Sequence, residues 1–222
     1  MISTNRFLNF FRTKQVTITF LFIIFYSVGV VGMLLPATAD YFQQLTPFAL
    51  LLSFTVLSLS DVSENRRKLL FYLLFIYLSS FAIEVAGVYT GVIFGTYSYG
   101  VNLGVKLWET PLIIGANWFF LVYTSAAIFE KTRITPPLKV LLASTTMLVY
   151  DIVMEQVAPK LDMWDWKHPS VPFQNYFSWF LIAIAFHIGL RSLKITIKNK
   201  LALSVLLCQF IFFVLLFIFL AR

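Results

Sequence analysis

The sequence has few charged side chains, few acids and almost no cysteine. Charged residues make up 12% of the 222 residues, and only 10 residues are Asp or Glu. So little charge does not cover the surface of a soluble domain of this length. Cys208 is the only cysteine. Neither a disulfide nor a cysteine metal site can therefore form within one chain.

Apolar residues make up most of the sequence, with a hydrophobic fraction of 59% and 25 Phe. About 20 residues of helix cross the roughly 30 Å hydrocarbon layer of a membrane. Runs near this length occur at 16–35, 45–60, 69–89, 110–129, 137–158, 175–191 and 201–220. The sequence therefore predicts an all-α integral membrane protein. We expect a bundle of about seven transmembrane helices in a single polytopic domain over residues 1–222.

The basic residues indicate how this bundle is oriented. Alternate connecting segments carry 13 and 4 of the 17 Lys and Arg residues, a count that includes Arg6 and Arg222. Cytoplasmic loops of membrane proteins hold the excess of Lys and Arg, so the N-terminus is expected in the cytoplasm and the C-terminus outside. The net charge of +7 is thus explained by topology and not by binding to nucleic acid.

The N-terminal segment also has features of a signal peptide. Basic residues precede an apolar run, and Ala37 to Ala39 match an A-x-A cleavage site. The apolar run is nearer 20 residues than the roughly 7 to 15 of a signal peptide. We therefore expect residues 1–39 to be retained, with the run as the first helix.

Three acids fall within the expected helices. Glu84 lies in the outer half of the third helix, and Asp151 and Glu155 lie in the outer half of the fifth. Residues four apart share one face of a helix, so Asp151 and Glu155 can share a site or a proton. Acids in a membrane turn inward to a cavity or to a partner. They are either functional or part of a structural hydrogen-bond network between helices.

Further polar residues are expected on the same outer side. Glu109 lies at the mouth of the fourth helix, Asn117 lies about two turns deeper, and Asn175 opens the sixth helix. The loop after the acid pair holds Asp162, Trp164, Asp165 and Trp166. Trp residues are common at any membrane interface. This loop is therefore either the rim of a cavity or an ordinary interfacial segment.

Four stretches carry a resemblance to a known family. They are "EVAGVYTGVIFGTYSYG", "LWETPLIIGANWFFLVY", "VYDIVMEQVAPKLDMWDW" and "PFQNYFSWF", and the resemblance runs roughly from Phe81 to Trp179. Together they resemble the membrane carotenoid-biosynthesis family that includes CruF-type carotenoid 1,2-hydratases and bisanhydrobacterioruberin hydratases. The resemblance implies addition of water across the terminal 1,2 (or 1′,2′) double bond of an acyclic carotenoid, which gives a tertiary alcohol. It implies no metal or redox cofactor, and lycopene, γ-carotene and a C50 carotenoid all remain candidate substrates.

Hydration of an alkene requires an acid that protonates C2, a site that tolerates a cation at C1, and a base that positions water. We expect Asp151 to be the proton donor because deep burial keeps a carboxyl protonated, with Glu84 as the second candidate. Glu155, nearer the outer water, is expected to orient the attacking water molecule. Glu109, Asn117 and Asn175 are expected to hold that water molecule by hydrogen bonds. The remaining expected substrate-binding residues are Asp162 and the aromatic residues Tyr97, Tyr99, Trp118, Trp164 and Trp166. The aromatic rings can face the cation.

Two other functions fit parts of the sequence. The Asp151-x3-Glu155 spacing is loosely similar to acidic motifs that hold magnesium against a diphosphate, as in a membrane prenyltransferase. That chemistry usually needs more oxygen ligands than one such pair provides. A seven-helix transporter is the non-enzymatic alternative, although the cytoplasmic half has no matching chain of acids. We expect an integral protein of the bacterial inner (cytoplasmic) membrane, with a lipid-soluble carotenoid, water and membrane lipids as its partners and its site toward the outer leaflet.

Overall fold

A computed structural model describes residues 2–220, with side chains from Leu8 onward. The helices are α1 (Ile2–Thr13), α2 (Gln15–Leu34), α3 (Ala39–Gln44), α4 (Thr46–Ser60), α5 (Arg66–Thr90), α6 (Ile113–Glu130), α7 (Pro136–Glu155), the short 3-10 helix η1 (Ala158–Leu161), α8 (Phe173–Ser192) and α9 (Ala202–Leu220). The strands are β1 (Tyr97–Tyr99), β2 (Lys106–Leu107), β3 (Thr110–Pro111) and β4 (Trp164–Trp166).

Each of the seven apolar runs forms one helix, namely α2 and α4 to α9. Among the described residues, 6 of these helices are long and apolar enough to cross a membrane. The remaining one, α4, is apolar but has only 15 residues. The chain is thus an all-α integral membrane protein, as predicted. The number of crossings and the orientation of the ends stay predictions.

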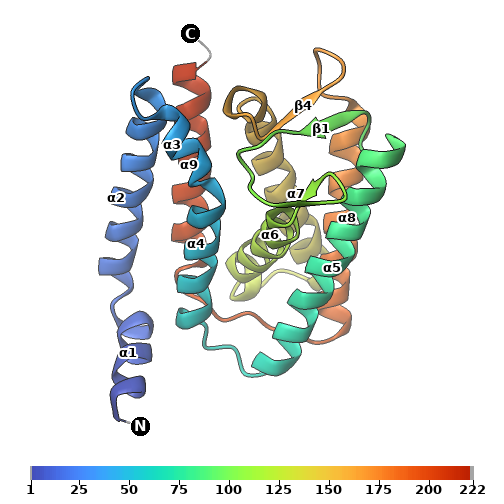
Figure 1. The fold of residues 1–222 in the computed structure, drawn as a ribbon. Helices are drawn as coiled ribbons and strands as arrows, with labels where there is room; N and C mark the ends of the chain where they lie inside the picture. Colours follow the sequence, from blue (N-terminus) through green and yellow to red (C-terminus); the bar gives the residue numbers. More distant parts are fainter. Residues whose placement is uncertain (1, 221–222) are drawn as a thin grey trace.

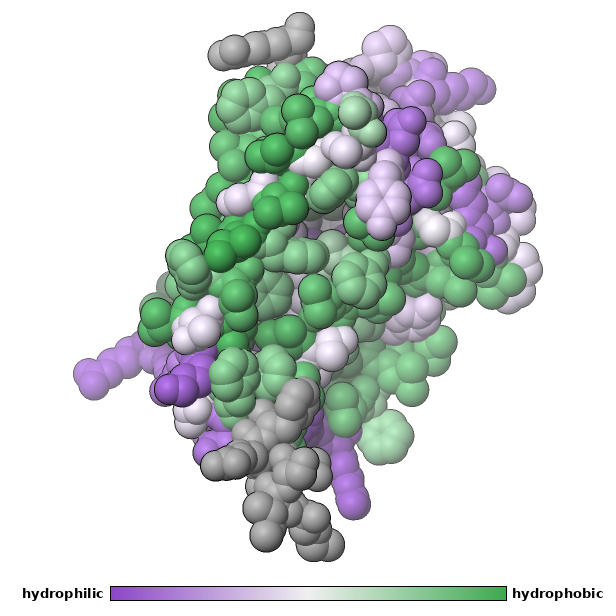
Figure 2. All heavy atoms as spheres, turned by 60° about the vertical axis from the view of Figure 1, so that its left-hand side comes forward, coloured by the Kyte–Doolittle hydropathy of each residue, from purple (hydrophilic) through white to green (hydrophobic). Residues whose placement is uncertain are grey.

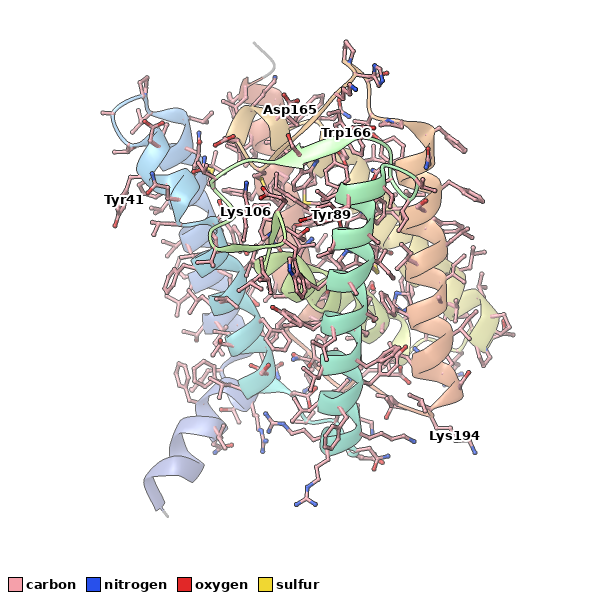
Figure 3. All side chains as sticks on the ribbon, turned by 45° about the vertical axis from the view of Figure 1, so that its right-hand side comes forward. Tyr41, Tyr89, Lys106, Asp165, Trp166 and Lys194 are labelled. Atoms are coloured by element: carbon pink, nitrogen blue, oxygen red, sulfur yellow. The ribbon has the colours of Figure 1, made fainter. Side chains whose placement is uncertain are left out.

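The seven helices run up and down between two ends of the bundle (Figure 1). We call the end that carries β1 to β4 and η1 the strand end, and the other end the loop end. The loop end carries the α4–α5, α6–α7 and α8–α9 connections. Arg222, which entered the charge count, lies outside the described residues, as does the side chain of Arg6. In Figure 3, Lys194 lies at the loop end and Asp165 at the strand end.

The helix α6 is the centre of the bundle. In its apolar window 72% of the residues are buried, against 33–39% in the other long apolar helices of the described chain. It packs against α4, α5, α7, α8 and α9. The surrounding helices turn apolar side chains outward, and the face formed by α1 to α4 is hydrophobic across its middle (Figure 2). This surface suits a hydrocarbon environment.

A hydrogen-bond network joins two connections at the loop end to α6. Buried Asp61 accepts hydrogen bonds from the Ser63 hydroxyl at 2.9 Å and from the Tyr123 hydroxyl of α6 at 2.6 Å. The Asn199 amide donates to the Tyr123 hydroxyl at 2.9 Å, and the Lys198 backbone donates to the Ser63 hydroxyl at 2.9 Å. These contacts fix the α4–α5 and α8–α9 connections against α6.

At the strand end, α5 ends where the chain turns back over the bundle. Gly91 adopts a left-handed conformation with φ 63°, and its N–H donates to the carbonyl of Gly87 at 2.9 Å. Glycine adopts this conformation without steric cost and is therefore common after the last turn of a helix. The chain then leaves α5 and forms β1, which lies over the helix ends.

Candidate active site

Strands β1 and β4 pair antiparallel and direct four aromatic side chains toward the helices. Tyr97 lies opposite Trp166, and Tyr99 lies opposite Trp164. Side chains alternate between the two faces of a strand, so the residues between them, Ser98 and Asp165, are exposed. The inner face of this small ladder is therefore entirely aromatic, and each ring carries a polar group at its edge.

The two tyrosines of β1 hold Glu84 of α5. Their hydroxyls donate to the same oxygen, Oε2, at 2.7 Å from Tyr97 and 2.8 Å from Tyr99. The indole N–H of Trp118, on α6, donates to Oε1 at 2.9 Å. Glu84 is 3% exposed. Three donors from two other elements thus fix this carboxyl group as a buried hydrogen-bond acceptor.

The two tryptophans of β4 hold Glu155 of α7 in the same way. Their indole N–H groups donate to Oε2 at 3.0 Å from Trp164 and 2.7 Å from Trp166. The Asn175 amide, at the start of α8, donates to Oε1 at 3.0 Å. Glu155 is 4% exposed. The ladder therefore supplies two donors to each glutamate, the tyrosines to one and the tryptophans to the other.

Asp151 is held differently from the two glutamates. It is 0% exposed, and its hydrogen bond is a long one of 3.3 Å from the Asn175 amide to Oδ2. Its other oxygen, Oδ1, has no hydrogen-bond partner among the described residues. Asn175 therefore links Asp151 to Glu155, one helical turn further along α7. Asp151 is the acid with the fewest donors in this cluster.

The surroundings keep the tyrosines of β1 in their neutral form. Burial, followed by the negative charge of Glu84, raises the pKa of Tyr97 and of Tyr99 above the usual value. A neutral phenol retains its O–H, so both side chains remain hydrogen-bond donors to Glu84 at neutral pH. The donor set of this carboxyl does not change over the ordinary pH range.

A small cavity lies between the two held glutamates, and we call it the acid pocket. Its volume is about 20 Å³. It is lined by Glu84, Phe94, Tyr97, Tyr99, Ile114, Asn117, Met154, Glu155, Trp164, Trp166, Asn175 and Trp179. A cavity whose volume is roughly 10–15 Å³ can hold one water molecule. The acid pocket therefore has room for a single water between two carboxyl groups.

A much larger cavity, which we call the apolar cavity, lies beside the acid pocket. Its volume is about 350 Å³, which is within the size range of small-molecule sites. Side chains from α2, α3, α4, α6, α7 and α9 line it, and most of them are aliphatic or aromatic. Four residues line both cavities: Ile114, Asn117, Met154 and Trp164. The acid pocket is thus separated from the apolar cavity by one layer of side chains.

The apolar cavity reaches the side of the bundle between α2 and α4. Val28, Tyr41 and Phe48 line it and are themselves 53%, 65% and 58% exposed. Tyr41 lies on α3 at the outer edge of the molecule, at the left in Figure 3. Toward the loop end, the Tyr26 hydroxyl and the Ser53 hydroxyl lie 2.9 Å apart and join α2 to α4. The opening therefore lies near the strand end, on a surface suited to lipid.

Most of the residues expected from the sequence meet at this site. Of the expected residues, the acid pocket lining includes Glu84, Glu155, Tyr97, Tyr99, Asn117, Trp164, Trp166 and Asn175. Trp118 itself donates to Glu84, and Asp151 contacts Asn175 without lining either cavity. The two glutamates, and not Asp151, are therefore the acids in the cavity wall.

Two expected substrate-binding residues, Glu109 and Asp162, lie outside both cavities. Trp108 and Glu109 form the two-residue turn between β2 and β3, with φ 52° and 57°. Such a turn points its side chains outward, and Glu109 is exposed and lines neither cavity. Asp162 is also exposed, and its carboxylate accepts a hydrogen bond from the Val101 backbone at 3.2 Å. Its contact supports the loop above the acid pocket and not the pocket itself.

Sequence reasoning missed other residues of the site. Trp179 of α8 stacks on Trp118 with ring centroids 3.9 Å apart, and Met154 lines both cavities. Met154 precedes Glu155 on α7, and Trp179 lies one turn after Asn175, so proximity to a predicted site residue was the available signal. The contributions of α2, α3 and α4 to the apolar cavity had no such signal, because their side chains there are ordinary apolar residues.

Comparisons with known proteins found a family model and a relative that match this chain. A family model described as "Carotenoid biosynthesis protein" matches residues 45–222. A bisanhydrobacterioruberin hydratase from Haloarcula japonica is 30% identical over 112 residues. The match covers 47% of this chain and 38% of that relative, so this chain aligns with less than half of the relative's length. No solved structure gives a significant match.

Proposed function

Because this chain belongs to the carotenoid biosynthesis protein family, we propose that it is a carotenoid hydratase. It adds water across the terminal 1,2 (or 1′,2′) double bond of an acyclic carotenoid end and produces a tertiary alcohol. The similarity to a relative that is named a hydratase supports this reaction type. The substrate is lycopene, γ-carotene or a C50 carotenoid, and water adds at an acyclic end of the molecule.

The arrangement of the two cavities is the observation that carries this proposal. Hydration needs an apolar site for the hydrocarbon and a polar site for one water molecule, with an acid and a base beside them. The apolar cavity of about 350 Å³ and the acid pocket of about 20 Å³ share a wall. In the proposed complex the carotenoid end lies in the apolar cavity. Its terminal double bond reaches the shared wall at Asn117 and Trp164.

The side opening between α2 and α4 supports delivery of such a substrate from the membrane. Carotenoid hydrocarbons dissolve in the bilayer and not in water. Exposed Val28, Tyr41 and Phe48 form a lining that such a chain can pass without crossing a polar surface. With the orientation expected from the basic residues, the opening faces the outer leaflet.

The acid pair of α7 supplies the proton in the proposed mechanism. The Asn175 amide donates to both Asp151 and Glu155. Two carboxyl groups this close cannot both ionise at low cost, so they share one proton. Asp151, with an unpartnered oxygen, stores the proton, and Glu155, which lines the acid pocket, delivers it to the alkene. Transfer of the proton to C2 leaves positive charge at C1.

The other groups of the acid pocket stabilise and capture this cation. The rings of Tyr99 and Trp164 provide negative faces, an interaction that contributes about 2 kcal/mol in a desolvated site. The Glu84 carboxyl, fixed by its three donors, provides a negative charge across the pocket. Water in the pocket forms the C1–O bond and returns one proton to the acid pair. The net reaction is alkene plus water to alcohol, so the acid pair is restored.

The test is expression in bacterial strains that accumulate lycopene, γ-carotene or a C50 carotenoid. Extracted pigments are separated by chromatography and examined by mass spectrometry for products heavier by one water. Glu84→Gln, Asp151→Asn and Glu155→Gln are run beside Asp40→Asn, which changes an exposed acid of α3. Each variant is compared at equal amounts of membrane-inserted protein.

We expect a hydroxylated carotenoid with the unchanged chain and with Asp40→Asn, none with Glu84→Gln or Glu155→Gln, and a large loss with Asp151→Asn. Loss in Glu155→Gln together with a residual rate in Asp151→Asn would support Glu155 as the group that delivers the proton. Unchanged pigments, in strains that make lycopene, γ-carotene or a C50 carotenoid, would rule out the proposed reaction.

A further inference from the structure

The apolar cavity contains two polar groups without hydrogen-bond partners. The Tyr150 hydroxyl and Gln209 Oε1 are buried and have no partner among the described residues. Tyr150 is 2% exposed and Gln209 is 7% exposed. Both side chains line the apolar cavity. They come from α7 and α9, whose other side chains in the cavity wall are Met154, Phe212 and Phe213.

Two other polar side chains of this cavity already have partners. The Tyr26 hydroxyl is bonded to Ser53, and the Thr46 hydroxyl donates to the Gln43 carbonyl at 2.7 Å. Buried polar groups in proteins are almost always hydrogen-bonded, and each exception needs a specific explanation. The two open groups therefore distinguish this part of the cavity from a passive hydrocarbon channel.

The chemistry of the two open groups matches one ligand function. Gln209 Oε1 accepts hydrogen bonds, whereas the Tyr150 hydroxyl can donate one. A ligand hydroxyl can donate to Gln209 and accept from Tyr150, so it satisfies both. A hydrocarbon satisfies neither, and an ether or a ketone lacks the donor that Gln209 requires.

The position of the two groups places them along the path of a bound chain. Tyr150 lies one helical turn before Met154, which is part of the wall shared with the acid pocket. Gln209 lies near the middle of α9. A chain whose end reaches the shared wall therefore passes these two residues inside the cavity.

We propose that Tyr150 and Gln209 form a hydroxyl-binding subsite in the apolar cavity, so that the cavity binds an isoprenoid alcohol more tightly than the corresponding hydrocarbon or ether. A hydrocarbon such as lycopene would bind without this contact. The hydroxyl preference rests on these two side chains. The isoprenoid nature of the ligand rests on the proposed function. The hydroxyl is one that the ligand already carries on entry, separate from the one formed at the acid pocket.

The test is equilibrium binding to the full chain in lipid nanodiscs. The probes are tritium-labelled geranylgeraniol and its methyl ether, with ligand concentration expressed as mole fraction in the lipid. The ether keeps an oxygen that accepts from Tyr150 but has no O–H for Gln209. The variants are Tyr150→Phe and Gln209→Leu. The matched control is Thr46→Val, which removes a cavity-lining hydroxyl that is already partnered.

We expect the alcohol to bind about 5- to 10-fold more tightly than the ether, which corresponds to one hydrogen bond. Gln209→Leu should abolish this preference, Tyr150→Phe should weaken binding of both probes, and Thr46→Val should leave the preference unchanged. Because both variants remove unpartnered polar atoms, their melting temperatures should stay equal or rise. This result would separate a ligand subsite from a structural role.

Equal affinity of the unchanged chain for alcohol and ether would overturn the subsite, as would a preference that survives in Gln209→Leu. Failure to bind either probe would overturn the isoprenoid ligand itself. A clear alcohol preference in a protein that hydrates no carotenoid would leave the subsite standing and remove only the proposed reaction. Binding and turnover therefore report separately on the two proposals.

Discussion

Trp164 and Trp166 donate their indole N–H groups to the same oxygen of Glu155, at 3.0 and 2.7 Å. The two residues lie at the two ends of a three-residue strand, and their rings share its inner face because side chains alternate along a strand. One short strand thus provides a pair of donors for one acid, while its partner β1 provides a pair for Glu84. The positions of the Glu84 and Glu155 carboxyl groups therefore depend on this ladder.

Trp166→Phe should reduce activity while leaving the ring packing in place. The substitution removes one donor to Glu155, and hydrogen bonds to charged groups contribute about 1.5–3 kcal/mol. We expect product formation to fall by roughly 10-fold or more, measured per amount of membrane-inserted protein. Trp108→Phe, at an exposed turn position, is the control. Full activity of Trp166→Phe would show that this donor has no part in the reaction.

Asn175→Ala should destabilise the protein through the acids that it links. The change removes the amide that donates to Asp151 and Glu155, at an expected cost of about 1–3 kcal/mol in the free energy of unfolding. In combination with Asp151→Asn the added cost should be smaller, because the two changes share one contact. Thermal unfolding of the single and double variants in detergent measures this coupling. Strict additivity of the two costs would contradict it.

The stability of the folded chain should fall at alkaline pH because of Tyr97 and Tyr99. Burial, then Glu84, raises the pKa of both phenols in the folded state, whereas an unfolded tyrosine ionises near about pH 10. Their contribution is complete below about pH 10 and is lost as the pH rises toward the folded-state pKa. The melting temperature of the unchanged chain should drop more steeply between about pH 9 and 11 than that of a Tyr97→Phe, Tyr99→Phe double variant. Parallel curves would exclude these two tyrosines as the cause.

Gly100→Ala should separate β1 from β4. A Cβ added at Gly100 would lie 2.1 Å from the Asp162 carbonyl oxygen, so the backbones must move apart. The hydrogen bond from the Gly100 N–H to the Met163 carbonyl, at 2.9 Å, would be lost. We expect a melting temperature several degrees lower and a large loss of activity. Ser98→Ala, at an exposed position of β1, should have neither effect, and a fully active Gly100→Ala protein would contradict this account.

The helices of the fold were predictable because hydrocarbon thickness imposes one length on them. The run expected at 69–89 forms a helix at 66–90, and the run at 201–220 forms one at 202–220. The pairing of Asp151 with Glu155 on one face also followed from helical spacing. Both inferences depend on local periodicity, which the sequence displays directly.

The contacts between distant segments were not predictable in this way. Strands β1 and β4 are each three residues long, which is too short for an alternating pattern to identify a strand. Asn175 was expected beside the acids, but its role as the link between Asp151 and Glu155 depends on how α8 packs against α7. Glu109 was expected at a helix mouth because Trp108 and Glu109 carry no Gly or Asn signal for the tight turn that they form.

The order in which the chain is synthesised gives the ladder a consequence for membrane insertion. The acids of α7 leave the ribosome before β4 and α8, which carry their donors, have been made. A carboxyl without partners opposes insertion of a helix by about 2.5–3.5 kcal/mol at the membrane centre. Residues 136–192 therefore enter the bilayer most favourably as one hairpin, and a nascent chain that stops short of Asn175 would retain α7 only weakly.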